Sequence, residues 1–474
     1  MVDVPMPMLT SPGRAPQAAG GRLVNVYPEK LPATAGKPHA YWRVPGLRSW
    51  ATTPGANYRG ALLVNNFIYA VIDNTVYTFS AAGGAGTALT GAVSGTAPVT
   101  MARNNKPTPD IVIVAPGDGV FWIDPGAPTA VAAYPDVDVG QPNAVVFHRG
   151  FFIFTYGDGK TRASDVNSTA INTLNVATAE SKPDTLYRPI PLGNGQLLLC
   201  GSNSMEVWGG INDTGYPFSY VSTIARGIVG IDAIAGHQDG FGKGIFFVGD
   251  DFKVSTLDGY TPVPVSVPDL DLLIEKEPDK TIITVSVYVS QGHGVVVVQG
   301  PQWCWEYDTT LQSWHERKSH LVNYWRGKFP LAAFGMWVSG DKESGDLAVV
   351  DGLTMTEFGN PLLIQVETGP MGAFPNKIRV NSIELYLTKG VGKATGADPL
   401  ETDPDISIEI SRDGGQNWSK PRVVKIGRQS LTDGRVRSAI WGQAQNQGVR
   451  WRLRESAPLQ FGFMGIDMQV DKLL

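Results

Sequence analysis

Short apolar runs separated by turn residues occupy most of the chain. Each unit is a β-branched or aromatic run, a turn containing Gly, Asp or Asn, and a second such run, which predicts a β-hairpin. In the first unit, Asp73 and Asn74 can take the positive φ angles of a tight two-residue turn. Seven hairpins are expected, at residues 67–79, 110–124, 145–159, 197–210, 244–259, 294–308 and 347–359.

The spacing of these hairpins predicts a β-propeller. Most of them begin about 50 residues after the previous one, with one shorter interval between the second and third, and a blade repeats every 40 to 50 residues or so. A ring of blades buries sheet faces that one small sheet leaves exposed. Six blades are favoured, because one blade can contribute two hairpins, and seven are the alternative. The crossover helices of a parallel α/β fold are missing.

Changes in composition and in the pattern of apolar residues along the chain predict three regions. Residues 1–44, rich in Pro and Gly, are expected to form an extended arm that is ordered against a neighbour rather than folded alone. Residues 45–359 would form the propeller. Residues 360–474 hold alternating strands with polar outer positions, which predicts a second, sandwich-like β domain. The fold class is therefore all-β.

Composition adds that this is a soluble globular type of chain, with 42% apolar and 18% charged residues. No apolar run approaches the roughly 18 residues of a membrane span, and the first residues lack a basic region followed by an apolar one. Cys200 and Cys304 both lie in apolar, strand-like runs. Buried free thiols and assembly in a reducing compartment are the expectation.

Positive charge is concentrated near the end of the chain. Residues 412–454 contain ten Lys or Arg and two Asp, a surplus of +8, so the rest of the chain, whose total is -5, carries -13. This split predicts that the two parts face different partners, and solvated arginines on a strand face are an equal alternative. The candidate basic interaction surface consists of Arg422, Lys425, Arg428, Arg435, Arg437, Arg450, Arg452 and Arg454.

Searches for catalytic and cofactor motifs give no site. The Gly-rich turn at Gly240 lacks the following helix of a phosphate-binding loop. His315 and His320 are five residues apart in strand and turn, so they do not match the zinc-protease helix. A GxSxG nucleophile elbow is also missing. We expect no catalytic residue, no cofactor and no metal.

One motif has an enzymatic association. Residues 411–418 read SRDGGQNW, the S-x-D-x-G-x-x-W turn called the Asp box in sialidases and other glycan hydrolases. Asp413 can accept hydrogen bonds from turn amides, Ser411 and Gly415 complete the turn, and Trp418 can pack over the hairpin. A sialidase repeats the box once per blade, whereas this chain has one good copy outside the propeller region. The structural role is therefore expected, and a glycan-binding or sialidase-like propeller is the alternative.

A longer stretch carries a resemblance to a known family. Residues 146–220, with ATAESKPD at 177–184, GSNSMEVWGG at 201–210 and YPFSY at 216–220, resemble the central region of the packaged-DNA stabilisation proteins, or tail nozzle/hub proteins, of short-tailed bacteriophages (podoviruses). PGLRSW from Pro45 and YRGALLVNNFIYAV from Tyr58 are similar to the first blade of that family. SRDGGQNWS, IWGQ and WRLRES resemble its terminal β domain, although a Leu-Gly pair expected after Trp441 is missing.

The resemblance implies a structural virion protein without enzymatic activity. It implies a homo-hexameric ring below the portal and its dodecameric adaptor, assembled in the bacterial host cytoplasm and located in the virion tail. Such a hub retains packaged DNA, forms the ejection channel without sequence-specific binding, and docks tail fibres or tailspikes and, in some phages, a needle or plug protein. An acidic channel wall would repel phosphates during ejection. The basic region would then contact acidic surfaces of the adaptor, a neighbouring subunit or a fibre.

Overall fold

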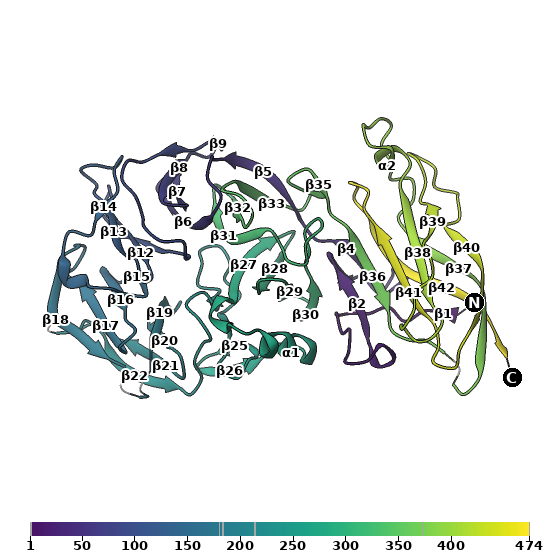
Figure 1. Cartoon of the computed structure of the whole chain (residues 1–474), viewed down its shortest axis with the longest axis horizontal. Helices are drawn as coiled ribbons and strands as arrows, with labels where there is room; N and C mark the ends of the chain where they lie inside the picture. Colours follow the sequence, from purple (N-terminus) through teal and green to yellow (C-terminus); the bar gives the residue numbers. More distant parts are fainter. Residues whose placement is uncertain (1, 180, 183, 213–214, 373, 474) are drawn as a thin grey trace.

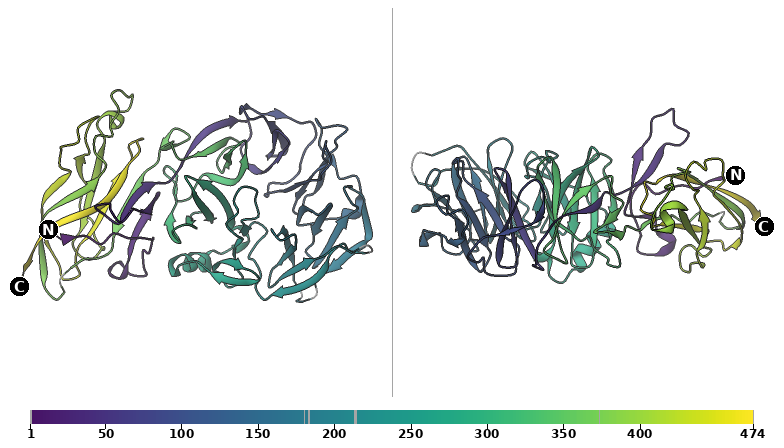
Figure 2. Two further views of the ribbon diagram at one scale, coloured as in Figure 1. Left: turned by 180° about the vertical axis from the view of Figure 1, so that it is seen from behind. Right: turned by 90° about the horizontal axis from the view of Figure 1, so that it is seen from above.

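The computed structural model describes residues 2–179, 181–182, 184–212, 215–372 and 374–473. Figure 1 shows a ring of small sheets on one side and a β-sandwich on the other, with both chain ends at the outer end of the sandwich. Seen from above, the two parts lie side by side in an elongated arrangement (Figure 2). The described residues contain two α-helices, α1 (Pro268–Lys276) and α2 (Pro399–Thr402), and neither is long and apolar enough to cross a membrane.

Within the described residues the ring is a β-propeller of seven blades, each with four antiparallel strands; blades 1 to 5 are separate four-stranded sheets, whereas blades 6 and 7 are parts of larger sheets. Blade 1 contains β6 (Tyr58–Val64), β7 (Phe67–Ile72), β8 (Thr75–Phe79) and β10 (Thr87–Ala88). Blade 2 contains β11 (Thr100–Arg103), β12 (Ile111–Ala115), β13 (Gly119–Ile123) and β14 (Ala132–Ala133). Blade 3 contains β15 (Ala144–His148), β16 (Phe151–Thr155), β17 (Lys160–Ser164) and β18 (Ile171–Thr178). Blade 4 contains β19 (Leu186–Pro191), β20 (Leu197–Gly201), β21 (Met205–Gly209) and β22 (Ser219–Ile224). Blade 5 contains β23 (Ile234–Ala235), β24 (Phe246–Val248), β25 (Val254–Asp258) and β26 (Thr261–Pro264). Blade 6 contains β27 (Thr284–Ser290), β28 (His293–Gln299), β29 (Cys304–Asp308) and β30 (Ser313–Glu316). Blade 7 contains β31 (Gly327–Ala333), β32 (Met336–Asp341), β33 (Leu347–Asp351) and β5 (Gly46–Thr52).

Blade number differs from the favoured prediction. Six was wrong and the alternative, seven, is what the structure has. The hairpins at 110–124 and 145–159, whose short separation suggested a shared blade, belong to separate blades 2 and 3. Blade 2 fits into a short segment because its outer strand β14 has only two residues.

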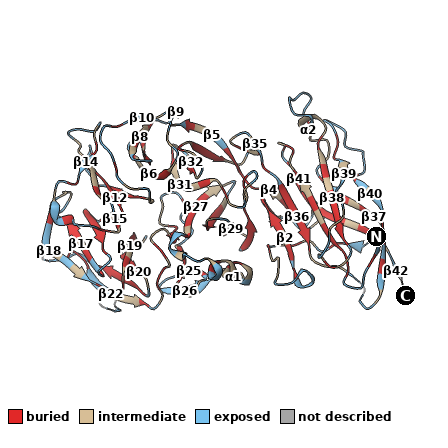
Figure 3. Cartoon of the chain, viewed as in Figure 1, coloured by how far each residue is buried: buried red, intermediate tan, exposed pale blue. Residues whose placement is uncertain are grey.

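Packing between blades explains the continuous apolar runs. Ile111 and Ile113 of β12 face blade 1, whereas Val112 and Val114 of the same strand pack with Phe152 and its neighbours in blade 3. A strand buried on both faces needs apolar residues at every position, because successive side chains point to opposite faces. Figure 3 shows this burial along the middle strands and exposure on outer strands such as β18.

The seventh blade closes the ring with a strand from the other end of the propeller sequence. β5 pairs with β33 on one side and, in parallel, with β34 (Thr356–Glu357) on the other. The short strands β9 (Gly84–Ala85) and β35 (Asn360–Pro361) extend this sheet. The hairpin predicted at 347–359 is therefore wrong, because β5 lies between its two strands. A pairing across about 300 residues leaves no signal in a local pattern.

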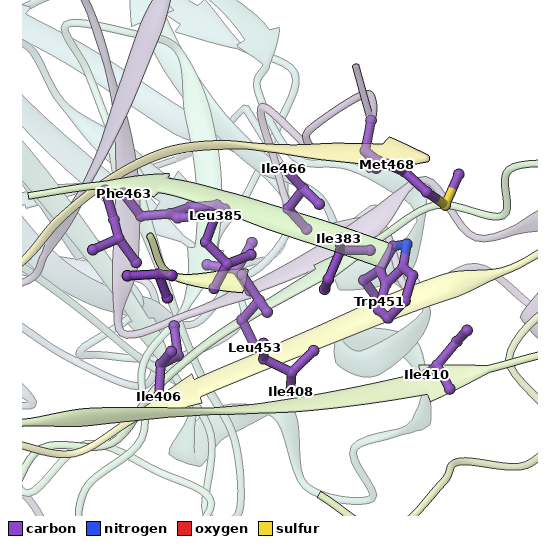
Figure 4. Packing of buried hydrophobic residues seen from close by; sticks show 14 of the residues in the cluster. Ile383, Leu385, Ile406, Ile408, Ile410, Trp451, Leu453, Phe463, Ile466 and Met468 are labelled. Carbon is purple, nitrogen blue, oxygen red and sulfur yellow. The ribbon is translucent and has the colours of Figure 1, made fainter. Parts of the chain in front are cut away.

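The sandwich has two sheets. One contains β2 (Gly21–Val24), β36 (Ile364–Thr368), β41 (Arg450–Glu455), β38 (Asp405–Ser411) and β39 (Arg422–Lys425), and the other β3 (Val26–Lys30), β4 (His39–Arg43), β42 (Gly462–Leu473), β37 (Lys377–Leu387) and β40 (Arg437–Ala444). β1 (Val2–Asp3) adds to β42. Apolar side chains from the facing sides, including Ile383, Ile408, Trp451 and Leu453, fill the space between them (Figure 4).

The N-terminal segment is not an arm ordered against a neighbour. Its strands β1 to β4 belong to the sandwich of the same chain, and Leu23, Val26 and Tyr41 are part of the sandwich core. β2 also pairs in parallel with β30, the outer strand of blade 6, so one nine-stranded sheet runs from the propeller into the sandwich. Backbone hydrogen bonds thus join the two parts directly.

Candidate functional site

The Asp-box turn follows β38 and is held by its own side chains. The Ser411 hydroxyl donates to Asp413 Oδ1 at 2.7 Å and accepts from the Gly415 amide at 2.7 Å. Asp413 Oδ1 accepts from the amides of Gln416 and Asn417, both at 3.0 Å, and Oδ2 accepts from the Asn417 side chain at 2.7 Å. Partial burial opposes ionisation, but these donors outweigh it and lower the pKa of Asp413 to about 2.

The other two residues of the motif contact the neighbouring strand β41. Gly415 has φ 108°, and a Cβ at this position would lie 2.5 Å from Arg450 Nη1, so both conformation and space require glycine. Trp418 lies under Arg452, whose guanidinium carbon is 3.7 Å from the ring centroid. The four motif residues therefore come together as a turn packed on a sheet. The hydrogen-bonding capacity of Asp413 is used within that turn.

Three of the predicted basic residues do not form a free basic surface. Arg450 is buried, and it pairs with Glu367 at 2.7 Å. Arg452 bridges Glu367 and Glu409, both at 3.1 Å, and Arg454 pairs with Glu409 at 3.2 Å. These side chains share one face of β36, β41 and β38, because alternate residues of a strand point the same way. The two carboxylates thus offset two of the three positive charges across the sheet.

Three further predicted residues are exposed but paired. Lys425 lies 3.1 Å from Asp405 and 3.5 Å from Asp403, Arg428 lies 3.7 Å from Asp403, and Arg435 forms an ion pair with Glu384. Exposed pairs of this kind contribute only about 0–1 kcal/mol. They nevertheless reduce the net positive charge that a partner would meet.

Arg422 and Arg437 form no ion pair with the described residues. Arg422 lies over the ring of Trp441, with 4.0 Å between its guanidinium carbon and the ring centroid, and donates to the carbonyls of Ala439 and Ile440 at 2.6 and 3.0 Å. Arg437 donates to Ser382 Oγ at 2.9 Å. Arg437 nevertheless stands opposite Glu384 in the pairing of β40 with β37, and after Arg435 it helps to lower the pKa of that carboxyl.

The sequence analysis missed Ile440. This residue is 82% exposed and has φ 62°, and it lies where the pairing of β40 with β37 is interrupted. A β-branched residue in the left-handed region is strained by roughly 1–3 kcal/mol. Gly442, two positions later, is the only sequence hint of an irregular strand, and it does not identify Ile440.

Two buried charge clusters at the propeller–sandwich junction were also missed. Arg43 of β4 pairs with Glu455 of β41 and donates to the Met355 carbonyl at 3.2 Å. Burial raises the pKa of Glu455 to about 7, although Arg43 acts in the opposite direction. Because partners so distant in sequence leave no local pattern, only the fold reveals such pairs.

The second junction cluster is centred on Glu306. It accepts from the Tyr288 hydroxyl at 3.0 Å and lies 2.9 Å from His315 Nε2, while Arg317 pairs with Glu357 at 2.6 Å and lies 4.0 Å from Glu306. Burial opposes ionisation of Glu306, but Arg317 and the two hydrogen bonds outweigh it and lower its pKa. His315, which the sequence analysis examined as a metal ligand, is thus part of this cluster. Among the described residues no group of three metal-ligating side chains occurs.

The inner strands of the propeller surround a cavity of 610 Å³. At its wall, Arg188 of blade 4 lies 3.1 Å from Asp232 before blade 5. Burial raises the pKa of Asp232 and lowers that of His237 to about 3 and of Lys328 to about 8. These groups connect neighbouring blades, and the cavity has the size of a small-molecule pocket.

Both cysteines are buried as free thiols, Cys200 in blade 4 and Cys304 in blade 6. Burial raises the pKa of each thiol above its usual value, so both stay protonated at neutral pH. Neither is positioned as a nucleophile.

Comparison with known proteins gives matches to two family models. The model described as "Bacteriophage P22 Gp10, beta-propeller" matches residues 21–355, and "Bacteriophage P22 Gp10, beta-sandwich" matches residues 366–470. No curated protein sequence matches the chain.

Several solved structures have a low similarity to this chain. PorZ from the type-IX secretion system of Porphyromonas gingivalis is 13% identical over 72% of this chain, with a TM-score of 0.40, and the match spans 45% of PorZ. The WD40 propeller of Doa1 is 11% identical, covers 64% of this chain and 96% of its own, and has a TM-score of 0.43. The designed protein Ika8 is 12% identical, covers 73% of this chain and all of its own (100%), and has a TM-score of 0.39.

Proposed function

The chain belongs to the family of bacteriophage P22 Gp10, a structural protein of the phage tail, and from this premise we propose that it forms the nozzle or hub of a virion tail. The observation that supports the proposal is that the propeller and sandwich models match in order along almost the whole chain. Such a protein acts by assembling, so its function depends on surfaces rather than on a catalytic pocket.

In this proposal six copies form a ring below the portal and its dodecameric adaptor. The ring retains the packaged genome and offers docking surfaces for tail fibres, tailspikes or a needle or plug protein. The continuous sheet from blade 6 through β2 into the sandwich supports such a role, because it joins the two parts by backbone hydrogen bonds. A subunit of this kind can transmit load between its partners without a flexible hinge.

DNA would pass through the centre of the ring and not through the propeller of one subunit. The propeller cavity measures 610 Å³, the size of a small-molecule pocket, and it is lined by closely spaced inner strands. A duplex, with a major groove about 12 Å wide, does not fit there. The -13 charge outside residues 412–454 would then repel phosphates along the channel. A channel lined by the +8 region would contradict this part of the proposal.

The role is proposed to be non-enzymatic, as the family of structural proteins suggests. The alternative glycan-hydrolase function finds no support in the Asp-box turn, where Asp413 is hydrogen-bonded to Ser411, Gln416 and Asn417. A catalytic carboxylate must instead be free to contact substrate.

The proposal is tested by the assembly state of the full chain. Light scattering and negative-stain microscopy, with and without the cognate adaptor, are expected to show a six-fold ring. A chain that remains monomeric in the presence of the adaptor would contradict the proposed hub.

A further inference from the structure

Two edge strands lie next to each other on the outer side of the sandwich. β39 ends the nine-stranded sheet, and β40 ends the six-stranded sheet that contains β37 and β42. Arg422 of β39 donates to the carbonyls of Ala439 and Ile440 on β40, so it joins the two edges. This side of the molecule is far from the propeller (Figure 1).

Several basic side chains on this edge form no salt bridge with a described residue. Of the ten basic residues between 412 and 454, four form no ion pair with a described residue: Arg412, Lys420, Arg422 and Arg437. All four are exposed, and Arg412 donates to the Trp441 carbonyl at 2.9 Å, beside Arg422. An acidic surface would therefore meet charges that are free to pair with it.

Apolar side chains stand among these charges. Ile440 is 82% exposed and Val423 is 61% exposed. Arginine and lysine on an edge strand often serve to prevent strand pairing. That role does not explain why a strained, β-branched residue at φ 62° presents its side chain to solvent at the same place. An apolar centre with a charged rim is the usual composition of a protein-binding surface.

The same chain carries a surface of opposite charge on the propeller. Residues 258–280 contain six acidic residues and only two lysines. None of the six acidic residues forms an ion pair with a described residue: Asp258, Asp269, Asp271, Glu275, Glu277 and Asp279. They lie at the end of β25, on α1 and just beyond α1. We call them the acidic belt. Tyr260 and Ile282, 39% and 48% exposed, add apolar surface near its two ends.

We propose that the basic edge, formed by Arg412, Lys420, Arg422, Val423, Arg437 and Ile440, binds the acidic belt of a second copy of this chain. The inference rests on the proposed ring and names the surfaces that would close it. Edge and belt occupy different places on one molecule, so the contact is heterologous. Repetition of a heterologous contact generates a ring when the rotation closes.

Charge exchange tests the contact in the full chain. The edge variant carries Lys420→Glu and Arg422→Glu. The belt variant carries Asp258→Lys and Glu275→Lys, because neither carboxylate accepts a hydrogen bond from a described residue. A third chain carries all four changes, which restores opposite charges with inverted sign. A control carries Lys160→Glu on β17 and Lys182→Glu between β18 and β19, two exposed lysines that belong to neither surface.

Self-association is measured by analytical ultracentrifugation at low and high salt. We expect the edge variant and the belt variant each to weaken self-association at least tenfold. The chain with all four changes should associate to within about threefold of the unmodified chain, and the control should have no effect. The unmodified contact should weaken with salt, since exposed charges are screened. Melting curves that match the unmodified chain show that the variants are folded. Ile440→Ser provides a second test without a change of charge, and it should also weaken association.

The outcomes separate this inference from the proposed function. A ring that forms equally well in the edge and belt variants would contradict the contact and leave the hub intact. Edge variants that assemble normally but fail to bind an adaptor or fibre would assign the basic edge to that partner and also contradict it. If self-association is lost in both the edge variant and the belt variant and is not recovered in the chain with all four changes, the two surfaces do not meet. A chain that is monomeric in every form and with the adaptor present would contradict both ring and contact.

Discussion

Replacing Asp413 by alanine separates the structural role of the Asp-box turn from a catalytic one. The change removes the acceptor of four hydrogen bonds, from Ser411 Oγ, the amides of Gln416 and Asn417, and the Asn417 side chain. A net hydrogen bond contributes about 0.5–1.5 kcal/mol when buried, but water can replace several of these donors because the turn lies at the surface. We therefore expect a loss of about 1–2 kcal/mol in the free energy of unfolding.

The loss should depend on pH with a definite sign. Hydrogen-bond donors lower the pKa of Asp413 from 3.8 to about 2 in the folded protein. The folded state therefore prefers the carboxylate, and the stabilisation is complete above the unfolded pKa and is lost as pH falls through the folded one. The difference between the unmodified and Asp413→Ala chains should be full at about pH 6 and smaller at about pH 3.

The assay is urea unfolding followed by the fluorescence of the chain's 12 tryptophans, which include Trp418, Trp441 and Trp451 in the sandwich. Asp433→Ala is a matched control, because Asp433 is exposed in the same domain and accepts no hydrogen bond from a described residue. The control should change stability by less than about 0.5 kcal/mol. If Asp413→Ala behaves like the control in stability but abolishes binding or hydrolysis of a glycan, the turn is a carbohydrate site and our reasoning is wrong.

Three other substitutions test the fold. Gly415→Ala should cost about 1–3 kcal/mol in a melting experiment, because φ is 108° and the new Cβ meets Arg450. Glu455→Ala leaves Arg43 buried without its carboxylate and should cost about 3–5 kcal/mol, most of which the double change Arg43→Met with Glu455→Leu should recover in urea unfolding. Leu47→Ala, on the strand that closes the ring, should cost about 2–5 kcal/mol, and a value near zero would contradict the importance of that closure.

Local patterns predicted the blades well where the strands that pair are neighbours in sequence. The predicted turn joins β7 to β8, and Asp73 has φ 50°, but Asn74, which was also expected to have a positive φ, is not among the residues that do. Six of the seven predicted hairpins are pairs of adjacent strands within one blade. The seventh failed because β5 enters between β33 and β34 from a distant part of the chain.

Non-local pairing also explains what was missed in the N-terminal region and the basic set. β1 pairs with β42 at the other end of the chain, and a two-residue strand carries no periodic pattern. Arg450, Arg452 and Arg454 alternate along β41 like an exposed basic face, yet each pairs with Glu367 or Glu409, which come from β36 and β38. Charge counted along the sequence therefore overstated charge available to a partner.

The path of the chain gives the propeller and the sandwich a common stability. The chain enters the sandwich through β1 to β4, closes the last blade with β5, runs around the ring, and returns to the sandwich through β36. The sandwich is built from both ends of the chain and the propeller from the segment between them; β2 joins the sandwich to blade 6, and β5 closes the ring of blades. Separating them requires breaking sheet hydrogen bonds and exposing the buried ion pair of Arg43 and Glu455. A force applied at the edge of the sandwich would therefore reach the propeller through a continuous sheet, as the proposed hub requires.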